Sequence, residues 1–235
     1  MITDKETFEA DIVVANSDYN HTEQVLIEKP YRAYDGNYWD KRVMSPSSLL
    51  FYLGVSKKIK NLLHHNLFFD ADLDQHSSEI YNNPRWPTEP LFYVCVPSKT
   101  DSTVAPEGME NLFLLMPLAP GIEDTPEQRK KYFNIMMKRL ESKAGENIND
   151  NIILNRSYCI SDFKNDYHSF KGNAYGLANT LDQTAVFKPK MVSPKVKNLF
   201  FTGQLTVPGP GVPPAIISGQ IVGSEIIKRI RNQQL

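Results

Sequence analysis

The most constraining feature of the sequence is the stretch PGPGVPPAIISGQ at residues 208–220, where four prolines and two glycines precede an apolar helical segment. Proline fixes φ and lacks a backbone N–H, whereas glycine adopts conformations that are closed to other residues. Pro213 and Pro214 suit the first positions of a helix, where an N–H has no intrahelical partner. Because the apolar run KNLFFTGQL at 197–205 comes just before, we predict a short strand, a sharp turn and a helix.

This turn is a candidate ligand site. Gly209 and Gly211 have no side chain, so a flat ligand can approach the backbone there closely. A helix start also carries unpaired N–H groups and a partial positive charge, which favour an anion or an electron-rich ring. The turn has an equally simple structural interpretation, because a lone glycine loop is a weak motif. Gly219 and Gly223, one turn apart in the helix, are likewise explained by close packing of a helix on a sheet.

Composition narrows the class of protein. The 235 residues are 41% hydrophobic and 23% charged, with a net charge of −1. Such a chain folds into one or two domains and shows no compositional sign of disorder. A nucleic-acid partner is not expected, because phosphate binding normally requires a surplus of Lys and Arg.

Cysteine and histidine spacing argues against a metal site. Cys95 and Cys159 are far apart, and neither has a second Cys or a His at metal-ligand spacing, so neither a zinc site nor a disulfide framework is expected. His64 and His65 are adjacent in a predicted strand. Their side chains should therefore point to opposite faces and be unable to ligate one metal ion.

The N-terminus and the apolar runs bear on localisation. The first residues are acidic where a signal peptide would be basic, and no apolar run approaches the roughly 18 residues of a membrane-spanning helix. We expect a cytoplasmic protein, for which peripheral contact with the inner face of the cell membrane stays open. Residues 28–44 mix aromatic and basic side chains, but their charges nearly cancel, so a loop with half-buried aromatics is favoured over a lipid-facing patch.

Hydrophobic patterning predicts two sheets. DIVVAN at 11–16 is typical of a strand buried on both faces, and Ser17 and Asp18 after it suit a helix cap, which indicates an α/β layer. Aromatic and branched runs bounded by Pro, Gly, Asn or Asp predict a second, largely antiparallel sheet from residues 47–55, 64–69, 90–98 and 111–117.

Helices and loops complete the pattern. We expect a helix at 72–81, and a longer one that begins with Thr125 as cap and Pro126 in the first turn and lies across a sheet face. Residues 151–160 predict another strand. The polar stretch 161–183 is expected to be a long loop that its four aromatic residues keep ordered.

Several stretches taken together resemble the bacterial-type carotenoid desaturases, the phytoene desaturase family of FAD flavoproteins. They are MSPSSLLFYLGV (44–55), HHNLFF (64–69), VPSKTDSTVAPEGMENLFLLMPLAP (96–120) and the whole of 172–220. The resemblance implies a mixed α/β fold, in which a Rossmann-like FAD-binding domain is interrupted by a substrate domain with an antiparallel sheet. It assigns 1–27 to the FAD-binding domain, 28–150 to the substrate domain and 151–235 to the return into the FAD-binding domain.

The same resemblance implies an activity and a site. The activity is removal of a hydride and a proton from a polyisoprenoid chain, with FAD as acceptor. Gly203 and Gln204 would lie near the pyrophosphate and ribityl chain of FAD, and Gly209, Gly211 and Val212 would lie against the flavin ring. No catalytic residue is assigned. The spacing of Asp162, Asp166 and His168 fits no acid–base template, and Lys99 and Asp101 are no better supported.

One part of the family pattern is absent from the sequence. No G-x-G-x-x-G turn follows a first strand, although this turn holds the ADP half of FAD. The chain therefore resembles the C-terminal half of a desaturase. We expect weak or no FAD binding and no desaturase activity unless the missing N-terminal half is supplied. The candidate protein partners are that N-terminal half or further copies of this chain. Two alternatives stay open: a cofactor-free module that binds an apolar lipid or a partner protein, and another flavin enzyme of the amine-oxidase type.

Overall fold

The computed structural model describes residues 1–234, and the chain divides into two compact units. Unit 1 comprises Met1–Ser45, Asn165–Phe170 and the chain from Tyr175 onward, and unit 2 comprises Pro46–Lys164 and Lys171–Ala174. The unit boundaries differ from the expected divisions at 27/28 and 150/151. Residues 28–45 stay with unit 1 because Trp39 packs in its core, and 151–164 stay with unit 2 because a strand there pairs within its sheet.

Unit 2 is built on a five-stranded antiparallel sheet in the order β3-β4-β5-β2-β6. The strands are β2 Ser47–Val55, β3 His65–Phe68, β4 Phe92–Cys95, β5 Glu110–Leu118 and β6 Ile152–Tyr158. All five lie where the hydrophobic patterning predicted strands, with ends that differ by one to three residues except for β2, which agrees at both ends. The antiparallel sheet is therefore confirmed.

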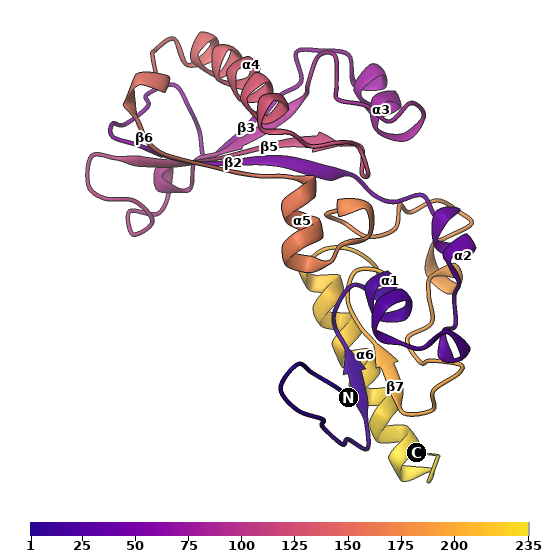
Figure 1. Cartoon of the computed structure of the whole chain (residues 1–235). Coiled ribbons are helices and arrows are strands. Elements are labelled where there is room, and N and C mark those ends of the chain that lie inside the picture. Colours follow the sequence, from indigo (N-terminus) through magenta and orange to yellow (C-terminus); the bar gives the residue numbers. More distant parts are fainter. Residues whose placement is uncertain (235) are drawn as a thin grey trace. The chain divides into compact units, whose positions relative to one another are not determined.

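One face of this sheet carries the core of unit 2. Along β5 the even-numbered residues are buried and the odd-numbered ones are only partly buried, which is the period of a strand covered on one side. Helix α4, Pro126–Ala144, lies over the buried face (Figure 1) and contributes Tyr132, Met136 and Leu140 to the cluster. Thr125 caps α4 by accepting the N–H of Gln128. The predicted helix across the sheet is confirmed.

Unit 1 contains a short parallel sheet. Strand β1 Val13–Ala15 pairs with β7 Leu199–Phe201, and α6 Val212–Arg231 runs alongside the two strands (Figure 1). Val14 is 46% exposed, so the expectation of a strand buried on both faces is wrong for β1. The reason is that, among the described residues, β7 is the only strand that pairs with β1.

An aromatic cluster forms the core of unit 1. Trp39, on the short helix α2 Gly36–Asp40, is fully buried, and Tyr19 stacks on Phe201 with ring centroids 3.8 Å apart. Tyr34 and Tyr38 pack around them. Residues 28–44 are thus mainly a loop whose aromatics face the protein interior, and burial of Trp39 goes further than the predicted half-burial.

The remaining helices are short. Helix α1 Tyr19–His21, which Asp18 caps, continues as a π-helix at Thr22–Leu26, and α3 Leu73–Tyr81 is capped by Asp72. Helix α5, Ile160–Tyr167, occupies the start of the stretch expected to be a loop, which corrects that expectation. One-turn 3₁₀ helices lie at Lys29–Tyr31, Pro97–Lys99, Asn149–Asn151, Phe170–Gly172 and Ala185–Phe187.

Helix α6 leaves much of its apolar surface uncovered. Ile216, Ile217 and Ile221 are 61%, 42% and 41% exposed. A Cβ atom added to Gly219 or Gly223 would meet nothing within 4 Å, so close packing on a sheet does not explain these glycines within the described residues. No helix of the described chain has both the length and the apolar character needed to cross a bilayer.

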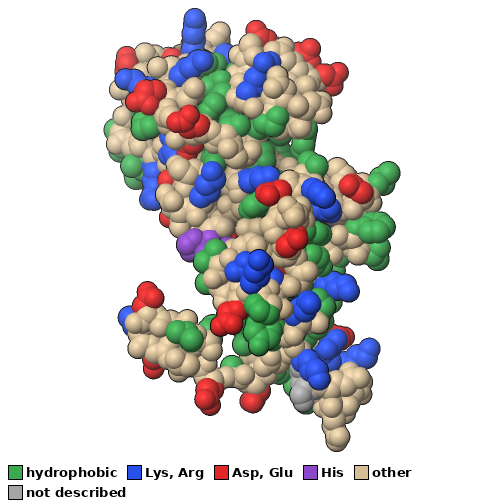
Figure 2. Space-filling model, turned by 45° about the vertical axis from the view of Figure 1, so that its right-hand side comes forward, with side chains coloured by type: hydrophobic (Ala, Val, Ile, Leu, Met, Phe, Trp, Pro, Cys, Tyr) green, Lys and Arg blue, Asp and Glu red, His purple; other side chains and the backbone are tan. Residues whose placement is uncertain are grey.

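Charged side chains of both signs are mixed over the face shown in Figure 2. This agrees with the near-neutral net charge of −1. The visible face carries no broad basic surface of the kind that binds a phosphate backbone.

Candidate functional site

The first part of the candidate site lies where β1 and β7 end. Parallel strands of an α/β sheet present their carboxyl ends at one edge, where ligands of such sheets commonly bind. Asn16 follows β1, and its Oδ1 lies 3.0 Å from the Thr202 hydroxyl that follows β7. Gly203 comes next, at φ 99°, a conformation that favours glycine. The structure therefore brings Gly203 and Gln204 to this edge, beside Asn16.

A buried serine ties this edge to helix α6. The N–H of Gly203 donates to Ser218 Oγ at 2.9 Å, and Ser218 donates in turn to the carbonyl of Ala215 at 2.6 Å. Ser218 is fully buried. The strand end and the first two turns of α6 are thus held together although the proline-glycine turn separates them in sequence.

The proline-glycine turn has the backbone that its sequence predicts. Gly209 has φ 134° and Gly211 has φ 107°, both in a region that residues with a side chain rarely adopt. Gly211 is the N-cap residue of α6 and makes no side-chain cap. A Cβ atom at Gly209 would lie 3.4 Å from Lys188 Cε, and one at Gly211 would lie 3.4 Å from Cδ of Pro214, so both glycines are in close contact with neighbouring side chains.

The hydrogen-bond donors at the start of α6 are fewer than a helix normally offers. Pro213 and Pro214 have no N–H, and the N–H of Ala215 donates to the Gly211 carbonyl at 2.9 Å. The expectation of unpaired N–H groups at this helix start is therefore wrong for Ala215, whose N–H is used within the helix. Val212, which is 74% exposed, carries the first-turn N–H that the helix itself does not use.

Lys188 is a member of this site that sequence reasoning did not identify. Its side chain is 4% exposed, and its ammonium nitrogen has no hydrogen-bond partner among the described residues. A Cβ atom placed on Gly209 would lie 3.6 Å from Lys188 Nζ and 4.0 Å from Asn179 Oδ1. Burial lowers the pKa of Lys188. No motif or residue spacing around Lys188 distinguishes it from a solvated surface lysine.

Gln204 is fixed by a close backbone contact. Gly176 has φ 73°, and a Cβ atom there would lie 2.8 Å from the Gln204 carbonyl oxygen, closer than real Cβ contacts come. Only glycine fits at position 176 without a shift of the neighbouring chain. The backbone of Gln204 therefore packs directly against the Gly176 segment.

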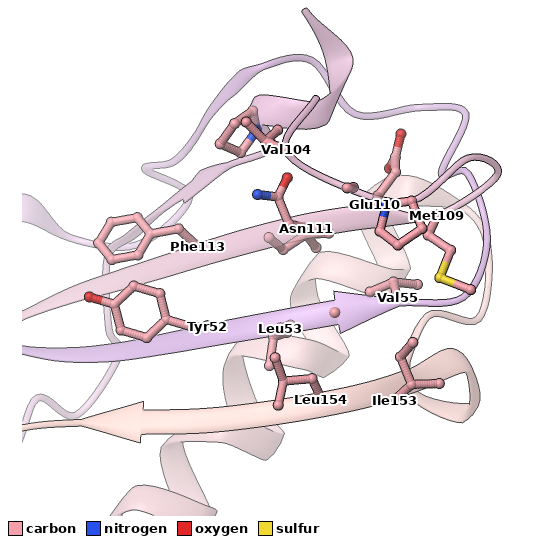
Figure 3. A pocket seen from close by; sticks show the side chains of 15 residues that line it. Tyr52, Leu53, Val55, Val104, Met109, Glu110, Asn111, Phe113, Ile153 and Leu154 are labelled. Atoms are coloured by element: carbon pink, nitrogen blue, oxygen red, sulfur yellow. The ribbon is translucent and has the colours of Figure 1, made fainter. Parts of the chain in front are cut away.

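Unit 2 carries a separate apolar pocket of about 380 Å³ on the sheet face that α4 does not cover. Figure 3 shows Tyr52 and Phe113 side by side on β2 and β5, with Leu154 on β6 nearby. The Tyr52 and Phe113 ring centroids are 5.3 Å apart. Residues of β2, β5 and β6 thus line this pocket with aliphatic and aromatic side chains.

The other candidate residues have mainly structural partners. Asp162 accepts the N–H of Cys159 at 2.8 Å and pairs with Arg129 at 2.8 Å. Lys99 pairs with the buried Glu110 at 2.7 Å. Asp101 accepts the N–H of Thr103. Asp124 and Ser161 complete the network around Arg129, so these groups serve the local fold of unit 2.

The histidine prediction is wrong in its geometry. His64 lies at a bend just before β3 rather than within the strand, so its ring is free to turn toward that of His65. The two ring centroids are 4.2 Å apart. Cys95, expected to lack a nearby histidine, lies in the same group: the ligand atoms of His64, His65 and Cys95 are all within 4.8 Å of one another.

The fold has a counterpart among solved structures. An oxidoreductase from Methanosarcina mazei has a similar structure, with a TM-score of 0.54 and 14% sequence identity, over 94% of this chain and 44% of that one. At this identity the likeness concerns the fold alone. It supports the mixed α/β fold expected from the sequence.

Sequence relatives define the family. The chain is 41% identical to a carotenoid 3,4-desaturase of Haloarcula japonica over 96% of its own length and 46% of the relative's. It is 30% identical to a zeta-carotene-forming phytoene desaturase of Myxococcus xanthus, and 29% identical to a 4,4'-diapophytoene desaturase of Staphylococcus haemolyticus. No protein-family model matches the chain.

The chain therefore belongs to the carotenoid desaturase family, as a C-terminal region of it. It spans about half the length of the curated relatives it matches, with 94% of the chain and 43% of the Myxococcus relative covered. The resemblance inferred from the sequence motifs is confirmed.

Proposed function

We propose that this chain forms the flavin-facing and substrate-facing part of an FAD-dependent carotenoid desaturase. The observation that carries the proposal is the buried ammonium group of Lys188 beside Gly209, which has no hydrogen-bond partner within residues 1–234. A buried cation without a partner destabilises a fold, whereas an anionic or electron-rich ligand next to it offsets that cost. FAD offers both kinds of group and is the cofactor that the family resemblance implies.

The residues of unit 1 fit such a ligand. Gly209 and Gly211 contribute no side chains of their own to the turn, and the Val212 N–H and the Lys188 ammonium supply donors to electron-rich atoms. We assign these groups to the flavin ring, and Gly203 and Gln204 to the pyrophosphate and ribityl chain. When bound, FAD supplies the two-electron acceptor needed to convert a carbon–carbon single bond into a double bond.

The substrate in this proposal is a polyisoprenoid chain. The pocket beside Tyr52 and Phe113 is apolar and has the size of a small-molecule site, so it suits a segment of a hydrocarbon. The identity of 41% to a carotenoid 3,4-desaturase, against 30% and 29% to enzymes named for phytoene-type substrates, makes desaturation at the 3,4 position the first reaction to assay.

The proposal includes a partner. We propose that a segment equivalent to the rest of the relatives' length supplies the glycine-rich turn that holds the ADP half of FAD. The exposed isoleucines of α6 are apolar surface that such a segment would cover. Because a carotenoid is a membrane-soluble molecule, we place the assembled enzyme in the cytoplasm, in peripheral contact with the inner face of the cell membrane.

Coexpression tests the proposal. The chain is produced together with the N-terminal half of the Haloarcula relative in cells that make an acyclic carotenoid. Flavin absorbance in the purified complex and a longer conjugated chain in the extracted pigment are expected. A colourless complex with unchanged pigment would contradict the proposal.

Matched lysine variants tie the result to the site. Lys188→Met is expected to weaken flavin retention and product formation by about tenfold or more, the usual cost of a lost charged contact in a shielded site. Lys190→Met, two positions away and exposed, should leave both unchanged. Equal effects of the two substitutions would remove the support that Lys188 gives.

The two alternatives predict different outcomes. A cofactor-free lipid module would bind carotenoid in gel filtration without ever retaining flavin. An enzyme of the amine-oxidase type would retain flavin but oxidise an amine and leave the carotenoid unchanged. Neither is favoured, because the relatives of this chain are carotenoid desaturases.

A further inference from the structure

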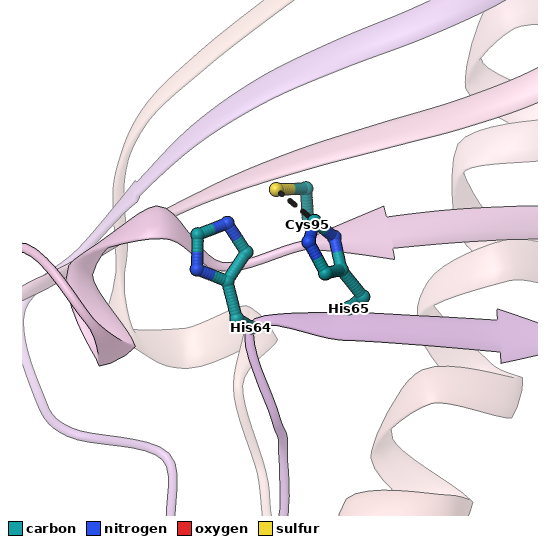
Figure 4. Close-up of side chains that lie close together, drawn as sticks. All are labelled: His64, His65 and Cys95. Atoms are coloured by element: carbon teal, nitrogen blue, oxygen red, sulfur yellow. Dashed lines mark hydrogen bonds between the residues drawn. The ribbon is translucent and has the colours of Figure 1, made fainter.

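A cluster of two imidazoles and one thiol lies on unit 2, outside the candidate flavin site and outside the apolar pocket. His65 is the first residue of β3, and Cys95 is the last residue of β4. The two residues are directly opposite each other in the antiparallel ladder. Figure 4 shows both rings and the sulfur of Cys95 gathered at the ends of these strands.

The register of the ladder explains why His65 and Cys95 approach so closely. The N–H of Val96 donates to the carbonyl of His64 at 2.8 Å, which makes the neighbouring couple His65 and Cys95 a non-hydrogen-bonded pair. Side chains in such pairs lie closer together than those in hydrogen-bonded pairs. The distance from Cys95 Sγ to His65 Nδ1 is 4.0 Å.

His64 joins the pair from outside the strand. Because it lies at a bend, its ring turns to the same side as that of His65 instead of the opposite side. All three ligand atoms fall within 4.8 Å of one another. In a tetrahedral zinc site, metal–ligand distances of about 2.0–2.3 Å place donor atoms roughly 3.3–3.6 Å apart, so small side-chain rotations suffice to close the cluster.

Two hydroxyl groups already orient the imidazoles. His64 Nδ1 lies 2.6 Å from the Thr100 hydroxyl, and His65 Nδ1 lies 2.5 Å from the Tyr93 hydroxyl. Metal-bound histidines typically hold a hydrogen bond through their second ring nitrogen, which fixes the tautomer and the ring plane. In this arrangement Nδ1 of each histidine keeps its hydroxyl partner and Nε2 binds the ion. For His65 this requires a rotation of the ring, because Nδ1 is the nitrogen that lies 4.0 Å from Cys95 Sγ. His65 is exposed, and His64 and Cys95 are partly exposed, so an ion can reach them from solvent.

We propose that His64, His65 and Cys95 form a site for a soft or borderline transition-metal ion, with Zn²⁺ as the principal candidate. Two imidazoles and a thiolate are ligands that Zn²⁺ prefers, and they leave a fourth tetrahedral position open. The ion would join the end of β4 to edge strand β3 and to the bend before it. This inference is independent of the proposed desaturase function.

Binding of the metal ion is coupled to the release of a proton. The thiol of Cys95 loses its proton to solvent, and each imidazole binds as the neutral ring through a nitrogen lone pair, so one proton is released for each ion bound. No oxidant or reductant takes part. Binding should therefore weaken as pH falls, because protons compete for all three ligands.

Co²⁺ is the probe of choice, because a cobalt–thiolate bond gives a near-ultraviolet charge-transfer band that histidine-only binding does not give. The metal-free 235-residue chain is titrated with Co²⁺, and then Zn²⁺ is added. We expect one Co²⁺ per chain with the thiolate band, and its displacement by one equivalent of Zn²⁺ together with a rise in the thermal midpoint of unfolding.

Variants identify the ligands. Cys95→Ser should abolish the band and weaken binding by at least about tenfold, and His65→Gln should weaken binding similarly without touching the sulfur. Thr100→Val, which removes the hydroxyl beside His64, should lower affinity by about tenfold, in the range seen for groups that orient ligands. Circular dichroism of the metal-free variants reports whether each one folds.

The chain also offers matched controls. Cys159 is fully buried, so Cys159→Ser should leave the band in place. His21 and His168 stack with ring centroids 4.0 Å apart but form no three-ligand group with a cysteine among the described residues, so His168→Gln should change nothing. A missing band, a band that survives Cys95→Ser, or weak binding of several ions that depends on His168 would overturn the proposal.

Discussion

The buried carboxylate of Glu79 in unit 2 and the buried ammonium group of Lys188 in unit 1 differ in how completely the described residues satisfy them. In unit 2 the buried carboxylate of Glu79 accepts bonds from Arg85 at 2.8 Å and from the Thr88 N–H at 2.9 Å. Although burial alone would raise the pKa of Glu79, these bonds lower it. Unit 1 instead holds Lys188, whose buried ammonium group has no partner among the described residues.

Both units leave apolar surface exposed, but on different elements. In unit 2 the large side chains of α4 and of one sheet face are enclosed together, while Leu67 and Phe69, at and just after β3, are each 64% exposed. In unit 1 Val14 and the isoleucines of α6 are exposed. The buried ammonium group of Lys188, which has no hydrogen-bond partner among the described residues, is the reason why the cofactor site is placed in unit 1.

The largest expected effect concerns the hydrophobic core of unit 2. Leu140 is fully buried on α4, so Leu140→Ala should lower the free energy of unfolding by about 2–5 kcal/mol through lost burial and a cavity. Ile216→Ala on α6, where the side chain is 61% exposed, should change it by no more than about 0.5 kcal/mol. Urea unfolding followed by circular dichroism measures both, and similar losses would abolish the contrast between the units.

A second test concerns the turn itself. Gly211→Ala should destabilise the chain by about 1–3 kcal/mol, because φ 107° is strained for any residue with a side chain. Gly36→Ala is the matched control, since a Cβ atom there meets nothing within 4 Å and no positive φ is required. An unchanged thermal midpoint for Gly211→Ala would show that the turn relaxes without cost.

A third test asks whether the buried ammonium group of Lys188 lowers the free energy of unfolding of the isolated chain. Lys188→Met removes an unpartnered buried cation, so it should stabilise the isolated chain by about 0.5–2 kcal/mol. The same substitution should reduce flavin retention in the assembled complex. The thermal midpoint of unfolding of the isolated chain measures this effect. A lower midpoint for Lys188→Met than for the wild-type chain would mean that Lys188 has a structural partner.

The smallest expected effect is a pH dependence in unit 2. His76 is 3% exposed, accepts the Leu91 N–H at 3.0 Å, and has its pKa lowered by burial. Its unfolded form binds protons below about pH 6.5 while the folded form does not, so stability is full above that pH and falls as the pH drops below it. The slope is at most about 1.4 kcal/mol per pH unit.

The variant His76→Gln isolates this contribution. The difference in unfolding free energy between the wild-type chain and the variant, measured at pH 7.5 and pH 5.5, should shrink toward the lower pH. If the difference is the same at pH 7.5 and at pH 5.5, the pKa of His76 is not lower in the folded chain than in the unfolded chain.

The sheet of unit 2 was predictable because its strands follow simple rules. The run of large apolar side chains along β5, and the turn residues that bound β2, act within a few positions of the sequence. Helix α5 was missed because most of its side chains are polar and partly exposed, a composition that equally suits a loop. Local signals therefore placed the strands but not this helix.

The candidate sites were harder to predict, because they depend on contacts between residues that are far apart in the sequence. The conformations of Gly209 and Gly211 follow from the absence of a side chain, so their role in the turn was predictable. Lys188 was not, because only the packed structure shows that its ammonium group is buried. His65 and Cys95 are thirty positions apart and meet through the strand register, which spacing rules for metal ligands do not include.

The two glycines in the middle of α6 have a consequence for how the helix unwinds. Each lowers intrinsic helix stability by about 1 kcal/mol relative to alanine, and no neighbouring atom within 4 Å of their Cβ positions makes that small size necessary. Most helices fray from their ends inward. In α6, exchange of amide hydrogens with water would also begin near the centre, around Gly219 and Gly223. The two halves of the helix would then bend relative to each other about this central segment.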